Sequence, residues 1–210
     1  MMSKANTTER LGYLAAISLT LCVTLFAIFM ITMNENLSYF VCIVLSWAYL
    51  IVACCYYDKS KTHTKVFALI GVAFAIIYVV LIDIVYFTQL TTVLSRTASP
   101  EILDVLSYSV LGSLMFNLDL LGYGMMAIST LFISFSINPE TTPERWLKYL
   151  MMIHGVFAVS CVMLPMMNIF NSDMVGGDLI GTLVLVFWCV YFIPIGVLSA
   201  KYFKKGIDNV

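Results

Sequence analysis

Two acidic residues lie inside long apolar stretches of this 210-residue sequence, and they are its strongest candidates for chemistry. Asp83 lies in YVVLIDIVYFTQLTTVLSR, and Asp119 lies in SLMFNLDLLGYGMM. No lysine or arginine lies close to either acid, so neither carboxyl group has a cationic partner at its own depth. A carboxyl group placed in this way holds a proton, shares one with a second carboxyl group, or binds a cation.

Polar and small residues accompany both acids at helical spacing. Tyr86 and Gln89 follow Asp83 at three-residue steps and form one stripe with it. Tyr123 shares the face of Asp119. That face also carries small and flexible residues that would leave space for a ligand, namely Gly112, Met115, Gly122 and Met126. We therefore predict a ligand-binding site formed by Asp83, Tyr86, Gln89, Asp119 and Tyr123.

The two carboxyl groups are expected at similar depth. Asp83 precedes Arg96 by 13 residues, and Asp119 follows Asp104 by 15 residues. At about 1.5 Å per residue, both would lie roughly 20 Å below the same loop. Spans joined by a short loop are usually neighbours, so we expect the two groups to lie near enough to meet. The alternative is that each is a neutral hydrogen-bond donor that holds helices together.

The other candidates favour structural roles. His154 lies in an apolar run, where a hydrogen bond between helices is favoured over a proton relay. All six cysteines fall in apolar runs without CxxC or metal-ligand spacing, and we expect free thiols. The sequence also lacks a recognisable nucleophile–base pair. We predict no catalytic residue, no metal and no cofactor.

The composition indicates how these residues are positioned. Hydrophobic residues make up 61% of the chain and charged residues only 11%. Soluble domains carry about a quarter charged residues, so the chain is not an ordinary soluble domain. Apolar runs of membrane-spanning length recur throughout, which predicts an all-α, polytopic integral membrane protein in contact with the lipid bilayer. A net charge of −1 argues against a nucleic-acid partner.

Polar turns divide the chain into six expected transmembrane helices that form a single domain over residues 1–210. We expect the first to be retained rather than cleaved as a signal peptide, because it is longer than a typical signal core. Ser99-Pro100-Glu101 has the pattern of a helix start. The expected spans cover about residues 11–33, 38–57, 66–93, 105–137, 145–170 and 174–202.

Basic residues predict the orientation. With a cytoplasmic N-terminus, ten of the eleven lysines and arginines fall on the cytoplasmic side, and Arg96 alone falls outside. We therefore expect both termini in the cytoplasm of a cell with the chain in its plasma membrane.

Three function classes remain open from the sequence. The first is binding or transport of a small, proton-linked or cationic ligand at the intramembrane acids. The second is a structural or interaction subunit of a membrane complex, in which the acids are helix-packing contacts. The third is an intramembrane enzyme, for which the sequence offers no catalytic constellation. No extramembrane stretch is long enough to fold as a domain, so any site must lie between or at the ends of the helices.

Overall fold

The computed structural model describes residues 4–170 and 177–208, with the backbone alone for residues 4–6 and 177–180. Over this part of the chain the regular structure is entirely helical. The helices are α1 (Lys4–Ile31), α2 (Glu35–Lys59), η1 (Thr62–Thr64), α3 (Lys65–Thr88), η2 (Gln89–Val93), α4 (Pro100–Leu106), α5 (Leu114–Ser136), α6 (Thr142–His154), α7 (Val156–Met166) and α8 (Gly177–Asp208).

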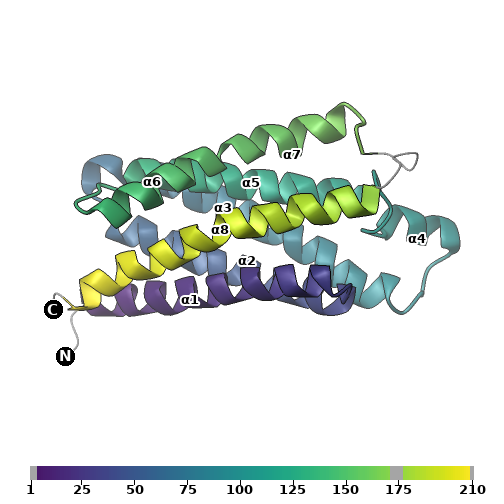
Figure 1. Cartoon of the computed structure of the whole chain (residues 1–210), viewed down its shortest axis with the longest axis horizontal. Helices are drawn as coiled ribbons and strands as arrows, with labels where there is room; N and C mark the ends of the chain where they lie inside the picture. Colours follow the sequence, from purple (N-terminus) through teal and green to yellow (C-terminus); the bar gives the residue numbers. More distant parts are fainter. Residues whose placement is uncertain (1–3, 171–176, 209–210) are drawn as a thin grey trace.

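The long helices run side by side in an elongated bundle (Figure 1), and their contacts close into a ring. α1 packs on α2 and α8, α2 packs on α3, and α3 packs on α5. α6 and α7 both contact α5, and α6 completes the ring by contacting α8. The described residues form six helical segments that are long and apolar enough to cross a membrane, which confirms the predicted number of such segments.

The fourth predicted span was wrong at its start. Residues 105–137 do not form one helix, because the short helix α4 ends at Leu106 and α5 begins only at Leu114. Gly112 has a φ of +78°, a conformation that favours glycine. The Ser113 hydroxyl accepts a hydrogen bond from the Phe116 amide and so caps α5. Local polar groups therefore end the helix inside an otherwise apolar run.

The helix start predicted at residues 99–101 is present, but it opens the separate helix α4. Pro100 occupies the first turn of α4. The Glu101 carboxylate accepts hydrogen bonds from its own amide and from the Ser99 hydroxyl, and these lower its pKa.

The fifth predicted span is divided where α6 meets α7. α6 begins with a capping box, in which Thr141 and Glu144 satisfy each other's backbone amides. It ends at His154, and Gly155 separates it from α7. A methyl group on Gly155 would lie 2.9 Å from Leu131 Cβ, so glycine permits a close approach to α5 here. For the sixth span, the expected start at residues 174–176 lies outside the described residues.

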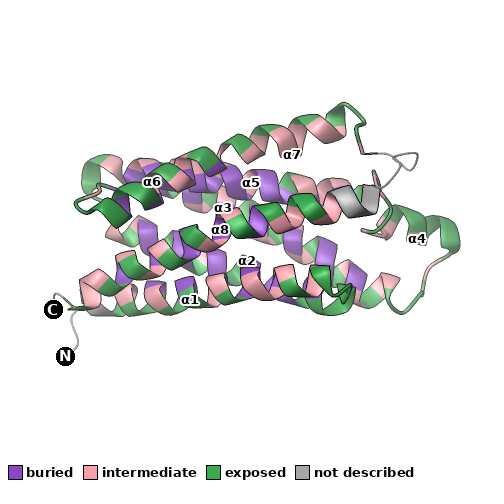
Figure 2. Ribbon diagram, viewed as in Figure 1, coloured by how far each residue is buried: buried purple, intermediate pink, exposed green. Residues whose placement is uncertain are grey.

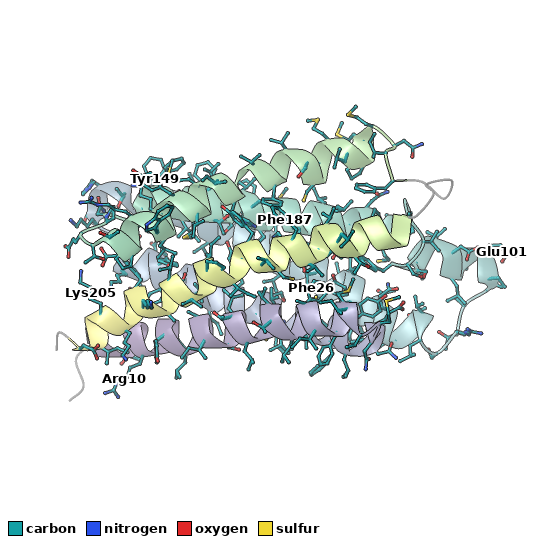
Figure 3. All side chains as sticks on the ribbon, in the orientation of Figure 1. Arg10, Phe26, Glu101, Tyr149, Phe187 and Lys205 are labelled. Carbon is teal, nitrogen blue, oxygen red and sulfur yellow. The ribbon has the colours of Figure 1, made fainter. Side chains whose placement is uncertain are left out.

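α1 begins and α8 ends at the same end of the bundle (Figure 1). Arg10 and Lys205 lie at this end, whereas Glu101 lies at the opposite, distal end (Figure 3). The charge asymmetry predicted from the sequence is thus an asymmetry between the two ends of the bundle.

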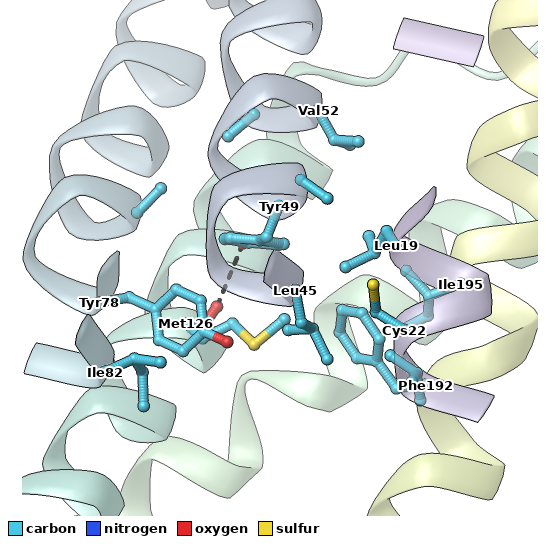
Figure 4. Packing of buried hydrophobic residues seen from close by; sticks show 14 of the residues in the cluster. Leu19, Cys22, Leu45, Tyr49, Val52, Tyr78, Ile82, Met126, Phe192 and Ile195 are labelled. Atoms are coloured by element: carbon cyan, nitrogen blue, oxygen red, sulfur yellow. Dashed lines mark hydrogen bonds between the residues drawn. The ribbon is translucent and has the colours of Figure 1, made fainter. Parts of the chain in front are cut away.

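Buried side chains line the inner faces of the helices, and many large apolar side chains are exposed on the perimeter (Figure 2). Tyr49 lies in this core with its hydroxyl near the Met126 carbonyl, at 3.4 Å (Figure 4). Its hydroxyl donates a hydrogen bond of 2.8 Å to Ser129 Oγ, which donates in turn to the Gly71 carbonyl at 2.7 Å. This chain of hydrogen bonds connects α2, α5 and α3 in the middle of the bundle.

Candidate functional site

Asp119 is the most deeply buried acid in the described part of the chain, with 1% of its surface exposed. It lies on α5, in the second turn of the helix, and faces α3. The Tyr86 hydroxyl of α3 lies next to the carboxyl group. Among the described atoms, Asp119 Oδ1 has no hydrogen-bond partner. Buried polar atoms are rarely left without a hydrogen-bond partner. Asp119 Oδ1 is therefore available to a proton or to a bound group from outside the described chain.

The packing of α3 against α5 determines which residues face Asp119. A methyl group on Gly122 would lie 3.0 Å from Ile82, and one on Gly71 would lie 2.5 Å from Ile133. These two close approaches fix the antiparallel register of the helices. In this register Tyr86 lies level with Asp119.

Tyrosine side chains form most of the shell around Asp119. The residues within electrostatic reach of its carboxyl group come from α2, α3, α5, α7 and the connection between α4 and α5, and they are Tyr39, Tyr78, Tyr86, Tyr108, Tyr123, Cys42 and Cys161. No basic side chain belongs to this described shell. The shell therefore offers hydroxyl and thiol groups, but no counter-charge.

Two groups of rings can be distinguished within this shell. Tyr39, Tyr86 and Tyr108 form a triangle with centroid separations of 5.4, 5.8 and 6.0 Å. Tyr78 and Tyr123 form the second group, 5.7 Å apart. The Tyr78 hydroxyl is the other buried oxygen without a partner among the described atoms. The two unpartnered oxygens thus belong to one tyrosine-rich cluster.

Tyr123, which the sequence placed in the site, does lie in this cluster. Its hydroxyl is 3.7 Å from Cys42 Sγ. Its ring meets the Trp188 ring edge-on at a centroid distance of 5.0 Å. Tyr123 therefore connects the Asp119 cluster to α2 and to α8.

Asp83 has a different environment. Its Oδ1 accepts a hydrogen bond of 3.1 Å from the Ser46 hydroxyl, and its Oδ2 accepts one of 2.9 Å from Trp47 Nε1. Both donors lie on α2, and Trp47 is half exposed at 51%. Asp83 therefore joins α2 to α3 near the perimeter of the bundle, as a packing contact would.

The structure does not bring Asp83 and Asp119 together as expected. No hydrogen bond joins these two described side chains. Tyr86 lies level with Asp119 and only three residues from Asp83, so the two acids differ in depth by only about 5 Å. They are separated because the Asp83 carboxylate is directed toward Ser46 and Trp47 of α2, whereas Asp119 lies among the tyrosines between α3 and α5.

The Gln89 side chain forms two hydrogen bonds to the backbone of the α4–α5 connection. Its Nε2 donates a hydrogen bond of 2.9 Å to the Leu106 carbonyl, and its Oε1 accepts one of 2.9 Å from the Tyr108 amide. Both ends of the amide are thereby used. Gln89 therefore positions Tyr108 next to the Asp119 cluster.

His154 is held by two defined partners. Trp188 Nε1 donates to His154 Nε2 at 3.0 Å, and His154 Nδ1 lies 2.7 Å from the Thr130 hydroxyl. Indole nitrogen can only donate, so Nε2 is the acceptor and the proton of the neutral ring lies on Nδ1. Thr130 accepts this proton and donates its own to the Ala127 carbonyl at 2.9 Å. His154 is thus a neutral link between α6, α5 and α8.

A cavity of about 400 Å³ opens at the distal end of the bundle, between α1, α2, α8 and the α4–α5 connection. We call it the distal cavity. Tyr39 and Tyr108 line it and also belong to the tyrosine triangle. The described residues that line it are Phe29, Met30, Met33, Glu35, Ser38, Tyr39, Tyr108, Ser109, Leu111, Phe116, Gly181, Thr182 and Leu185. The triangle therefore separates this cavity from Asp119.

The end with the termini is closed by ion pairs. Lys59 pairs with Glu9 at 2.9 Å, and Lys205 pairs with Glu140 and Glu144 at 2.9 and 3.0 Å. These pairs line a second hollow of about 350 Å³. These paired groups satisfy one another, so they are poorly suited to hold a charged ligand.

The Asp119 cluster is suited to proton chemistry. Among the described residues, no three histidine, cysteine or acidic side chains are placed to hold a metal ion. A proton requires neither a set of ligands nor a cavity. The tyrosine hydroxyls can donate to an ionised carboxyl group or accept from a protonated one.

Sequence inspection missed the residues that complete the site. The sequence did not indicate Tyr39, Tyr78, Tyr108 or Trp188 as members of the site. They lie on four separate segments, so no spacing along the chain relates them. The available signal was compositional, because twelve tyrosines are many for a chain of 210 residues.

No family model matches the chain, and neither do the curated proteins or the solved structures with which it was compared.

Proposed function

We propose that the chain is a plasma-membrane protein with cytoplasmic termini that binds or transports a small cationic ligand in a proton-linked manner. Asp119 is the group that carries the proton in this proposal. The distal cavity is its ligand entrance from the outside of the cell.

The observation that carries the proposal is the unpartnered Oδ1 of buried Asp119. A packing contact gains its stability from a completed hydrogen bond, as Asp83 and His154 both illustrate. Leaving a buried acceptor unpaired costs about 1–3 kcal/mol. A role that requires the group to change its protonation state accounts for that cost.

The tyrosine triangle supplies a route between the ligand and the proton. Tyr39 and Tyr108 line the distal cavity, and Tyr86 approaches Asp119. A ligand that moves the Tyr39 and Tyr108 rings would also move the Tyr86 ring, because Tyr86 packs against both. Ligand binding and protonation would then influence each other, as linked equilibria must.

A second candidate function is a structural subunit of a membrane complex. It is supported by Asp83 and His154, which serve as hydrogen-bonded links between helices. On this interpretation Asp119 would not change its protonation state, and this difference separates the two candidate functions experimentally.

Labelling with dicyclohexylcarbodiimide tests the proposal, because this apolar reagent reacts with protonated carboxyl groups in membrane interiors. The purified protein would be labelled in detergent and its peptides mapped by mass spectrometry. We expect an adduct on Asp119 that is absent from Asp119→Asn and retained in the matched variant Asp83→Asn. Absence of label from Asp119, with label restricted to exposed acids such as Glu101, would favour the structural role.

A further inference from the structure

The described side chains that line the distal cavity carry a negative charge and no positive charge. Glu35 is the single acidic residue among the described residues that line it, and none of them is lysine, arginine or histidine. Tyr39 donates a hydrogen bond of 3.4 Å to Glu35 Oε2, so the carboxylate is directed toward the aromatic wall. The cavity therefore favours a positively charged occupant over a neutral or anionic one.

The wall of the distal cavity is rich in aromatic rings. Phe29 from α1, Tyr39 from α2, and Tyr108 and Phe116 from the start of α5 and its preceding connection all line it. The rings of Tyr39 and Tyr108 stand at 75° to each other, and those of Tyr108 and Phe116 at 40°. Aromatic faces attract cations, most effectively where water is excluded.

The size of the cavity favours an organic occupant over a bare metal ion. A volume of about 400 Å³ falls within the range of sites that hold small organic ligands. Glu35 is the single carboxylate among the described lining residues, whereas sites for hard metal cations usually combine several carboxylate and carbonyl oxygens. An organic cation uses the aromatic faces and the apolar side chains together.

We propose that the distal cavity binds a substituted ammonium ion, with Glu35 as its counter-charge and the rings of Tyr39, Tyr108 and Phe116 around its alkyl groups. This inference rests on the proposed function and names its ligand class. The ammonium group belongs either to a free solute or to a lipid headgroup, because the cavity lies at the end of the bundle where headgroups are found.

Thermal unfolding of the full chain in dodecyl maltoside tests this binding with choline as the probe. Its neutral isostere, 3,3-dimethylbutanol, has the same shape without the charge. We expect choline to raise the melting temperature saturably, with the isostere at least about tenfold weaker. Equal effects of the two compounds, or no effect of either, would overturn the proposal.

Matched variants locate the site. Glu35→Gln and Tyr108→Leu should each weaken choline binding by about tenfold, whereas Tyr108→Phe keeps the ring and should retain it. Glu35 is exposed, so its variant is expected to fold even if Tyr108→Leu does not. Unchanged choline binding in Glu35→Gln would contradict the assignment.

Two further measurements test whether the proton role is independent of cation binding and where the ammonium group comes from. Asp119→Asn should still bind choline, so failure of the proton role and failure of the cation site can be told apart. Repeating the titration in nanodiscs of phosphatidylglycerol and of phosphatidylcholine distinguishes the sources. Loss of the choline effect only in phosphatidylcholine identifies a lipid headgroup as the occupant, and persistence in both identifies a free solute.

Discussion

The ring of Tyr39 stacks on the ring of Tyr86, with centroids 5.4 Å apart and planes inclined by 27°. Tyr39 lines the distal cavity, and Tyr86 approaches the buried Asp119 carboxyl group. One pair of rings therefore separates the space in which a cation would bind from the group that would hold a proton. A change on one side of this pair should be felt on the other.

Cation binding and protonation should be coupled. A cation in the distal cavity favours the ionised form of Asp119, so choline binding should release protons, and the affinity for choline should rise with pH. Both effects should disappear in Asp119→Asn and persist in Asp83→Asn. Proton release in weakly buffered detergent, followed with an indicator dye, provides the measurement. A choline affinity that depends on pH equally in all three proteins would contradict the coupling.

The close approach of α3 to α5 should be sensitive to a single methyl group. In Gly71→Ala the new Cβ would lie 2.5 Å from Ile133, which forces a shift and should cost about 1–3 kcal/mol of unfolding free energy. Gly181→Ala is the matched control, because a Cβ atom there would have no described atom of another segment within 4 Å. It should be neutral or stabilising by up to about 1 kcal/mol. Unfolding in a detergent titration measures both, and equal stabilities would refute the packing argument.

The His154 link should contribute to stability without contributing to proton chemistry. Replacing His154 with alanine leaves the Trp188 N–H unpartnered and should cost about 1–3 kcal/mol of unfolding free energy. His63→Ala, in the exposed connection between α2 and α3, should change stability by less than about 0.5 kcal/mol. His154→Ala should still take up the carbodiimide label on Asp119. Loss of that label in a folded variant would assign His154 to the proton site instead.

The orientation prediction concerns the basic end of the bundle. Reporter fusions after Lys61 and after Lys205 should report the cytoplasm, and a fusion after Pro100 should report the outside. A signal from outside the cell with the C-terminal fusion would reverse the orientation. The distal cavity would then open toward the cytoplasm.

Hydropathy was sufficient to predict the helical architecture. Each of the six apolar runs contains a helical segment of membrane-spanning length, the fifth of them divided at Gly155, because backbone hydrogen bonds must be satisfied within such a segment. The predicted helix bounds were wrong where local turn and capping residues end a helix although the hydropathy stays high. Ser113 and Gly112 interrupt residues 105–137, although most of their neighbours are apolar.

The site was predicted only in part for a related reason. Asp119, Tyr86 and Tyr123 share helical faces that can be derived from spacing along one segment. Tyr39 and Tyr108 reach the site through tertiary packing, which spacing does not encode. Asp83 was grouped with Asp119 because similar depths were expected, but its carboxylate is directed toward Ser46 and Trp47 of α2 instead of toward Asp119.

Infrared spectroscopy of the carboxylic-acid C=O stretch tests the proton role of Asp119 most directly. We expect a band in the wild-type protein that is missing from Asp119→Asn and present in Asp83→Asn. This band should follow pH and weaken when choline is added, but not when 3,3-dimethylbutanol is added. A wild-type spectrum with no band assignable to Asp119, or a band that neither pH nor choline changes, would contradict a proton-linked cation site.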